Sequence, residues 1–199
     1  MRLRDTLVAL ATFVCLLAVH AVPAGANDGL LGVFFDRNGA SCSGNVPTAS
    51  LATLHVVLLT DGSTFAGVTG AELSIEPSAA GVFFLQGEDV EAGGLQLGNA
   101  LAGGTTIGFS SCHSGAAVPI MSFQAFNLGN PARDVELRVR ARNRPSNPFM
   151  RCPLAVLCDD PHTAVCVTGS KAILNPSPNR TCQGGRESAE WSRLKDLYR

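Results

Sequence analysis

The sequence is poor in charge and in aromatic side chains, and these shortages exclude several classes of protein. Only 16% of the 199 residues are charged and 6% are aromatic, with a single Trp and a single Tyr. The formal net charge is −1 at pH 7, which argues against a nucleic-acid-binding protein, because such proteins draw much of their affinity from neutralising phosphates. The 46% of hydrophobic residues is too high for a disordered chain. We therefore expect a folded domain that binds no nucleic acid.

Several motifs of enzymes and membrane proteins are missing too. The sequence contains no C-x-x-C redox pair, no G-x-S-x-G nucleophile elbow and no phosphate-binding glycine loop. After residue 26, no apolar run approaches the roughly 20 residues that a membrane-spanning helix needs. We expect a non-catalytic protein with no cofactor, and with no membrane span once the N-terminal segment is removed.

The first 26 residues have the pattern of a secretory signal peptide. Arg2 and Arg4 give a positive start, residues 6–19 are almost entirely apolar, and Ala24-Gly25-Ala26 places small residues before Asn27. An uncleaved membrane anchor is the alternative, for which the apolar run is short. The sequence predicts a protein that is secreted or held at the cell surface.

The cysteines agree with export. One of the seven lies in the predicted signal peptide, and an even number remains, which is typical of disulfides in an oxidising compartment. These six are Cys42, Cys112, Cys152, Cys158, Cys166 and Cys182. The sequence does not determine their pairing, although proximity favours Cys152 with Cys158.

A metal site is the alternative use of the same cysteines. Cys152, Cys158, His162 and Cys166 offer the ligand types that zinc prefers, as a small metal-dependent hydrolase would require. The paired C-x2-C knuckle of structural zinc sites is missing, and an oxidising compartment competes for the thiols. We therefore predict disulfides and no bound metal.

The body of the chain alternates short apolar segments with turns rich in Gly, Pro, Asn and Asp. The candidate strands are 30–36, 51–60, 71–76, 82–85, 105–109, 118–126, 135–141, 163–167 and 172–174. Short strands at this spacing predict an all-β fold, an antiparallel β-sandwich of about nine strands. In residues 71–76 apolar side chains alternate with Glu72, Ser74 and Glu76, so we expect a wet outer face there.

The domain organisation follows from composition. We assign one β-sandwich domain to residues 27–175, a linker rich in Pro and Gly to 176–185, and a short C-terminal helix to 186–199. In that helix Trp191, Leu194 and Tyr198 recur at i, i+3 and i+7. An isolated helix this short is marginal in water. We expect it to dock on its own domain or on another protein, or to act as a sorting or retention signal.

Residues 67–76, Gly-Val-Thr-Gly-Ala-Glu-Leu-Ser-Ile-Glu, carry a resemblance. They look like the strand in which cohesin-type and related bacterial β-sandwich modules place small residues before alternating apolar positions. The whole chain is similar to exported immunoglobulin-like or cohesin-like proteins of GC-rich bacteria. The resemblance implies a non-catalytic binding or scaffold module. It transfers no binding residue, because the matching positions are structural.

Few residues suggest chemistry. His55 lies in the most apolar segment and is typical of a hydrogen-bonded core histidine, while His113 is typical of a turn. The acidic clusters are typical of solvated faces and loops rather than of a glycosidase pair or a calcium site. These clusters are Glu72 with Glu76, Glu88-Asp89 with Glu91, and Asp159-Asp160.

The charge is distributed unevenly. Residues 27–132 contain one base and eight acids, whereas residues 133–199 contain twelve bases and seven acids. The basic part includes an arginine row, which a period of two places on one face of a strand. The row consists of Arg138, Arg140, Arg142 and Arg144. It is the candidate contact surface for a protein partner or an anionic polysaccharide, since guanidinium groups bind carboxylates bidentately.

Two structural explanations of the arginine row stand beside that one. Charge protects an exposed strand from pairing with another edge, and the row also has the sign needed to pair with the face of Glu72 and Glu76 in the same molecule. The leading hypothesis is an exported, non-catalytic module with a docking or structural role. The alternative is a glycan-binding module that uses polar loops or the arginine row, and the metal-dependent hydrolase is third. The oligomeric state stays open.

Overall fold

The computed structural model describes residues 29–60, 66–91, 93–129, 133–161 and 163–182. The predicted signal peptide, the last residues of the predicted linker and the predicted C-terminal helix with Trp191, Leu194 and Tyr198 lie outside these ranges. Within them, no helix is long and apolar enough to cross a membrane.

Nearly all regular structure in the described ranges is β. The strands are β1 (Leu30–Phe34), β2 (Ser43–Gly44), β3 (Leu51–Leu59), β4 (Val68–Pro77), β5 (Phe83–Val90), β6 (Gly94–Asn99), β7 (Gly104–His113), β8 (Ala117–Asn127), β9 (Val135–Arg140), β10 (Leu154–Leu157), β11 (Ala164–Cys166), β12 (Thr168–Gly169) and β13 (Lys171–Leu174). A single 3-10 turn, η1 (Ala100–Ala102), precedes β7.

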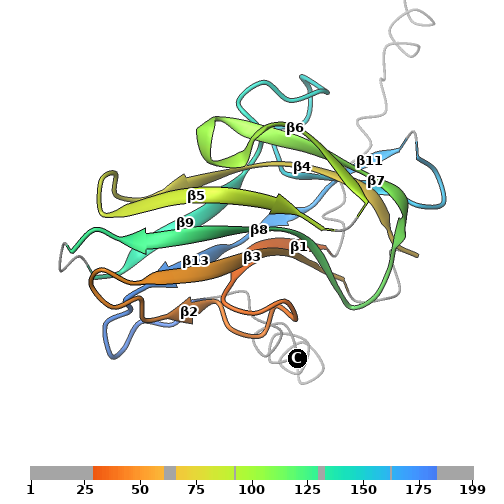
Figure 1. The fold of residues 1–199 in the computed structure, drawn as a ribbon. Coiled ribbons are helices and arrows are strands. Elements are labelled where there is room, and N and C mark those ends of the chain that lie inside the picture. The colour runs from red at the N-terminus through yellow and green to blue at the C-terminus, as the bar shows by residue number, and fades with distance from the viewer. Residues whose placement is uncertain (1–28, 61–65, 92, 130–132, 162, 183–199) are drawn as a thin grey trace, which may run out of the picture.

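Two sheets pack face to face (Figure 1). The first has five strands in the order β12-β1-β3-β8-β5. In the second, the path β11-β10-β4-β9-β13-β2 is joined at β4 by β7, which also pairs with β6. All pairings are antiparallel except two short ones, β1 with β12 and β2 with β13. The predicted all-β sandwich is confirmed.

Residues 164–174 tie the two sheets together along one side. β11 and β13 pair with β10 and β9 of the second sheet, whereas β12, between them, pairs with β1 of the first sheet. The chain therefore steps from one sheet to the other and back within eleven residues. The sandwich is closed at this side.

Strand β4 organises the second sheet. Gly70 in its first half lies opposite Gly108 of β7 on one side and Val156 of β10 on the other. Ser74 in its second half lies opposite Arg140 of β9. Between β9 and β10 the chain leaves the sheet as residues 141–153, here called the crossing loop. Because the Ser74 hydroxyl donates to the Ala141 carbonyl at 2.8 Å, the crossing loop begins directly over the outer face of β4.

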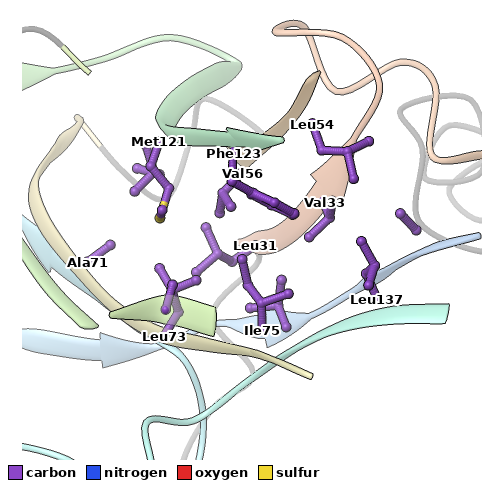
Figure 2. Close-up of a cluster of buried hydrophobic side chains, with 14 of the residues drawn as sticks. Leu31, Val33, Leu54, Val56, Ala71, Leu73, Ile75, Met121, Phe123 and Leu137 are labelled. Atoms are coloured by element: carbon purple, nitrogen blue, oxygen red, sulfur yellow. The ribbon is translucent and has the colours of Figure 1, made fainter. Parts of the chain in front are cut away.

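The core lies between the two sheets and consists of the side chains that their strands point inward (Figure 2). It follows from period-two alternation, which places every second side chain on the inner face. Its members include Leu31, Val33, Leu54, Val56, Leu73, Ile75, Met121, Phe123 and Leu137, all buried. Truncating one such side chain to Ala costs about 2–5 kcal/mol.

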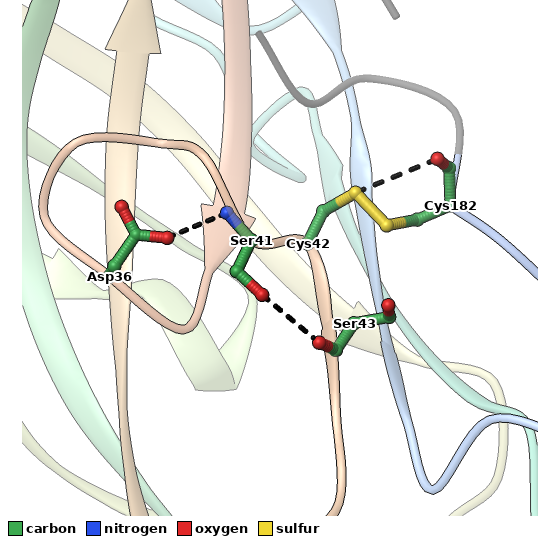
Figure 3. The surroundings of a disulfide bond; sticks show 5 residues. All are labelled: Asp36, Ser41, Cys42, Ser43 and Cys182. Carbon is green, nitrogen blue, oxygen red and sulfur yellow. Dashed lines mark hydrogen bonds between the residues drawn. A yellow bond between two sulfur atoms is a disulfide. The ribbon is translucent and has the colours of Figure 1, made fainter. Parts of the chain in front are cut away.

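A smaller apolar cluster lies on the outer face of the first sheet and explains why β3 is apolar on both faces. It consists of Phe34, Cys42, Val57 and Leu59. The turn after β1 folds over it, and Asp36 holds that turn by accepting the backbone N–H groups of Asn38 and Ser41 at 2.9 and 2.6 Å. Cys182, bonded to Cys42, also packs against this cluster (Figure 3).

The sequence pattern predicts nine of the strands but not β2, β6, β10 and β12. β2 and β12 have two residues each, which is too short for a periodicity to be read. β6 begins at Gly94 and is followed by Gly103, and these glycines favour turns over strands. β10 follows the irregular crossing loop and has four residues. Short strands of this kind are fixed by pairing with neighbours rather than by their own pattern.

Candidate functional site

The arginine row is not a single row in space. Arg138 and Arg140 lie on β9, which ends at Arg140, so the prediction of a continuous strand face through Arg144 is wrong. Arg142 and Arg144 belong to the crossing loop. The loop turns away because Ala141 bonds Ser74 and the backbone N–H of Asn143 donates to the Gly103 carbonyl at 3.0 Å.

Three of the four arginines pair with acids of the same molecule. Arg138 lies 2.5 Å from Glu136, Arg142 lies 3.7 Å from Glu72, and Arg140 lies 3.9 Å from Glu76. Arg144 is exposed and makes no ion pair with another residue of the described ranges. The intramolecular explanation therefore accounts for most of the row, and Arg144 is its free member.

Part of the outer face of β4 is buried, although the alternation of apolar and polar residues predicts that this face is exposed to solvent. Glu72 and Ser74 are buried, and of the three polar residues only Glu76 is exposed. The Glu72 carboxylate accepts the Thr106 hydroxyl at 2.9 Å and the backbone N–H of Ser146 at 3.0 Å. The crossing loop covers this carboxylate. Sequence periodicity misses it because the cover comes from a distant, irregular segment.

Glu136 is the centre of the strongest charge cluster. Its carboxylate is buried and receives Lys171 Nζ at 2.6 Å, Arg180 at 2.7 Å and Arg138 at 2.5 Å. The Lys171 ammonium lowers the pKa of Glu136 most, burial opposes it, and the two guanidinium groups lower it further, to about 2. These contacts join β9, β13 and the segment that follows β13. We interpret this cluster as stabilising the fold rather than binding a ligand, since each of its three cations already contacts the Glu136 carboxylate.

All six cysteines are paired. The disulfides are Cys42–Cys182, Cys112–Cys158 and Cys152–Cys166. The pairing of Cys152 with Cys158, favoured by proximity, is wrong, because β10 lies between them and places Cys152 beside Cys166 of β11.

The disulfides also remove the sulfur ligands of the alternative zinc site. Cys152, Cys158 and Cys166 are bonded to other cysteines, and His162 lies outside the described residues. In the described ranges no three His, Cys, Asp or Glu side chains gather as metal ligands do. The hydrolase hypothesis loses the thiolates on which it rests.

The histidines differ from their expected settings. His55 is half-buried on the outer face of the first sheet, next to the small cluster, and its Nδ1 has no hydrogen-bond partner in the part of the chain that the structure describes. Burial and the nearby Arg37 lower its pKa. His113 ends β7 instead of lying in a turn, and its ring lies against that of Phe109, with centroids 4.4 Å apart and the planes tilted by 39°. His55 lies opposite Ser122 of β8, but its Nδ1 accepts no hydrogen bond from that hydroxyl.

An exposed apolar surface, which the sequence pattern does not predict, lies on the outer face of the second sheet. Leu95 and Leu97 of β6 are 67% and 62% exposed. Leu95 lies opposite Gly108 of β7, which lies opposite Gly70 of β4. With Val156 of β10, these residues form one line across four strands, here called the glycine row.

The glycine row is flat because its two central residues have no side chains. A Cβ at Gly108 would meet open space, whereas one at Gly70 would lie 2.6 Å from the Ile107 carbonyl oxygen. The crossing loop stands beside this row, and its Phe149 is 93% exposed. Gly108 is exposed whereas Gly70 is buried, so the main chain of β7 is accessible beside the exposed Leu95 and Leu97. The signal in the sequence is the alternation Leu95-Gln96-Leu97 between glycines.

Comparison with known proteins bears on the fold. No family model matches the chain, and no curated protein matches its sequence. Among solved structures, the cohesin module of a family 33 glycoside hydrolase from Clostridium perfringens superposes with a TM-score of 0.50 at 9% identity, over 76% of this chain and 99% of the module. The chain has a cohesin-like fold.

Two further cohesin structures are similar to a lesser degree. The non-cellulosomal cohesin of the archaeon Archaeoglobus fulgidus has a TM-score of 0.48 at 10% identity, over 82% of this chain and 97% of its own. The third cohesin of ScaC from Acetivibrio cellulolyticus, solved with the ScaB dockerin, has a TM-score of 0.45 at 6% identity, over 74% and 98%. The predicted cohesin-like resemblance is confirmed at the level of the fold by the Clostridium perfringens module.

Proposed function

We propose that this chain is a non-catalytic protein-docking module that acts outside the cytoplasm, and that its contact surface is the glycine row together with Leu97 and Phe149. The observation that carries the proposal is the pair of leucines exposed on β6 beside accessible main chain. A soluble protein rarely leaves large apolar side chains grouped on a flat sheet face unless they contact a partner.

The shape of this surface favours a protein partner. With no Cβ at the exposed Gly108, an incoming side chain reaches the main chain of β7, and Leu95 and Leu97 of β6 line one side of it with apolar atoms. Phe149 adds a large ring on the crossing loop, and aromatic side chains are common anchors at protein interfaces. The partner that fits is a protein element presenting apolar side chains.

The polysaccharide alternative draws less support from the same surface. Leucines and glycines offer few hydrogen bonds to sugar hydroxyls, and three of the four arginines already bind carboxylates of this molecule. Of the arginine row, only Arg144 has a guanidinium group without an ion pair to another described residue. A partner recognised through the arginine row would need to displace Glu72, Glu76 or Glu136.

Three disulfides support the location. Disulfides persist in oxidising compartments and are rare in the cytosol. Together with the N-terminal sequence pattern, they favour a module that works in the cell envelope or the medium. The cohesin-like likeness concerns the fold, so the docking role rests on the surface described above.

Site-specific photo-crosslinking tests the proposal. A benzophenone side chain placed at position 97 should give a discrete adduct with a protein of the producing organism's envelope or extracellular fraction. The matched control places the same group at Ala80, which is exposed in the turn between β4 and β5, and should give none. The double variant Leu95→Asp, Leu97→Asp should abolish capture while Ala80→Asp leaves it unchanged. Equal adducts at positions 97 and 80, or capture that survives the double variant, would refute this contact surface.

A further inference from the structure

A second exposed apolar group lies on the other side of the molecule, on the outer face of the first sheet. Leu51 of β3 is 48% exposed, Phe84 of β5 is 52% exposed and Leu128, just after β8, is 54% exposed. Leu51 and Phe84 both lie opposite Phe126 of β8, which stands between them and is half-buried. These four side chains, here called the apolar row, cross three strands.

This outer face carries an apolar patch at each end, and only one of the two is covered by other parts of the described chain. Toward the other end of β3, the small cluster around Val57 is covered by the turn after β1 and by Cys182. Between the two ends lies a polar line, where Thr53 faces Gln124 and Gln124 faces Gln86. The described residues therefore cover one apolar patch of this face and leave the other, the apolar row, without a cover.

The chain itself supplies a candidate cover. The Cys42–Cys182 disulfide fixes Cys182 against the small cluster, so the last 17 residues start on the outer face of the first sheet. Their sequence predicts a helix over 186–199 whose apolar stripe is Trp191, Leu194 and Tyr198. A helix this short needs a surface to pack on.

The length of a helix over residues 186–199 matches the distance along β3 from the small cluster to the apolar row. From Val57 to Leu51 along β3 the distance is about 20 Å at roughly 3.3 Å per residue. A helix over 186–199 has a length of about 21 Å, and residues 183–185 add up to about 10 Å of extended chain. A helix that leaves Cys182 and follows β3 would bring its apolar stripe over the polar line and the apolar row.

We propose that residues 186–199 pack as a helix on the apolar row of their own molecule, with Trp191, Leu194 and Tyr198 facing Leu51, Phe126 and Phe84. The tether at Cys182 gives the tail an effective concentration in the millimolar range at this face, which a second molecule in dilute solution does not reach. The inference is independent of the proposed docking function, which uses the opposite sheet.

The single tryptophan of the chain reports on this contact. In the full-length exported protein, Trp191 emission should be blue-shifted and protected from acrylamide, at least threefold relative to the same protein in denaturant. Leu51→Asp with Phe84→Asp should shift the emission to that of exposed tryptophan, whereas Ala80→Asp should leave it unchanged. All these positions are exposed or partly exposed, and unchanged thermal unfolding would show that the sandwich stays folded.

Crosslinking identifies the occupant. A benzophenone side chain at position 84 should form an intramolecular bond to a residue within 186–199, found by peptide mass mapping at the mass of the monomer. Dimer-sized adducts or concentration-dependent emission would show that a second copy covers the row, and would overturn the proposal. Tryptophan emission typical of full exposure in the unmodified protein would overturn it as well. Loss of the position 97 adduct with partner would leave this result untouched.

Discussion

The backbone N–H of Ser146 donates a 3.0 Å hydrogen bond to the buried carboxylate of Glu72. The two residues are 74 positions apart, and their contact holds the crossing loop against the outer face of β4. Arg142 and Thr106 contact the same carboxylate. The course of the crossing loop, which carries the exposed Phe149, depends on this attachment, since nothing in the loop itself is a helix or a strand.

Replacing Glu72 by Ala should therefore release the crossing loop. We expect a loss of about 1–3 kcal/mol in the free energy of unfolding, because a buried charged acceptor and its hydrogen bonds are removed. Hydrogen exchange at Ser146 should accelerate at least tenfold. Glu76→Ala is the matched control, since Glu76 is exposed and its ion pair with Arg140 is worth about 0–1 kcal/mol. Equal effects of the two substitutions would contradict the attachment.

The disulfides should differ in what they contribute. Cys152–Cys166 closes a loop with a sequence separation of 14 and Cys42–Cys182 one of 140. Chain-entropy arguments give about 3 kcal/mol for the short loop and about 5 kcal/mol for the long one. Denaturant unfolding of the paired Cys→Ser variants should show this order. Peptide mapping without reduction should recover Cys152 with Cys166, and a Cys152–Cys158 peptide would refute the assigned pairing.

The Glu136 cluster should set the acid stability. Its pKa lies near 2 in the folded protein and near 4.5 when unperturbed. A carboxylate whose folded pKa is lowered stabilises the fold fully above its unfolded value, and this stabilisation disappears as the pH falls from about 4.5 to about 2.

Glu136→Gln tests this directly. The variant should be less stable than the parent by roughly 2–3 kcal/mol at pH 6–7, and the gap should close toward pH 2. Thermal unfolding from pH 7 to pH 2 measures it. A stability gap that does not change over this range would show that packing, rather than ionisation, is the source of the effect.

Replacement by Ala should change the stability much less at Gly108 than at Gly70, which lies opposite it on β4. Gly108→Ala adds a methyl group to open space and should change the stability by less than about 1 kcal/mol. Gly70→Ala brings Cβ to 2.6 Å from the Ile107 carbonyl oxygen and should cost about 1–3 kcal/mol. Because Gly108→Ala keeps the fold, it also probes the docking surface, where it should weaken capture of the position 97 partner. Capture unchanged in Gly108→Ala would show that the partner does not approach the row closely.

The sequence predicts the sandwich because β4 and β8 carry long period-two patterns, and because β1 and β3 are apolar segments that only layered sheets can bury. The sequence pattern does not predict burial where a side chain is covered by a segment that is distant in the sequence. Glu72 alternates with apolar residues as a solvent-facing residue should, but the crossing loop buries it. Leu95 and Leu97 sit among glycines that favour turns, so their strand and their exposure are invisible without the neighbours Gly108 and Thr106.

The charged residues illustrate the same limit. The acidic and basic halves of the chain are evident from composition, and the pairing of the arginine row with Glu72 and Glu76 was one of the options that followed. The involvement of Glu136, whose neighbours in sequence do not distinguish it, required the pairing of β9 with β13. Disulfide connectivity was out of reach for the same reason, since it depends on which strands lie side by side.

The Cys42–Cys182 bond has a mechanical consequence. A pulling force applied at the two ends of the chain enters the domain at β1 and leaves at Cys182, and the covalent bond to Cys42 carries it past the 140-residue span between the two cysteines. Of the described residues before Cys182, only those up to Cys42 bear tension, and of the strands only β1 lies in that path. β1 pairs with β3 in the antiparallel and with β12 in the parallel direction, and the force would load the hydrogen bonds to both strands in shear. An oxidised molecule anchored at one end and pulled at the other would therefore lengthen by one strand and its turn, while the contact surface on the opposite sheet keeps its shape under load.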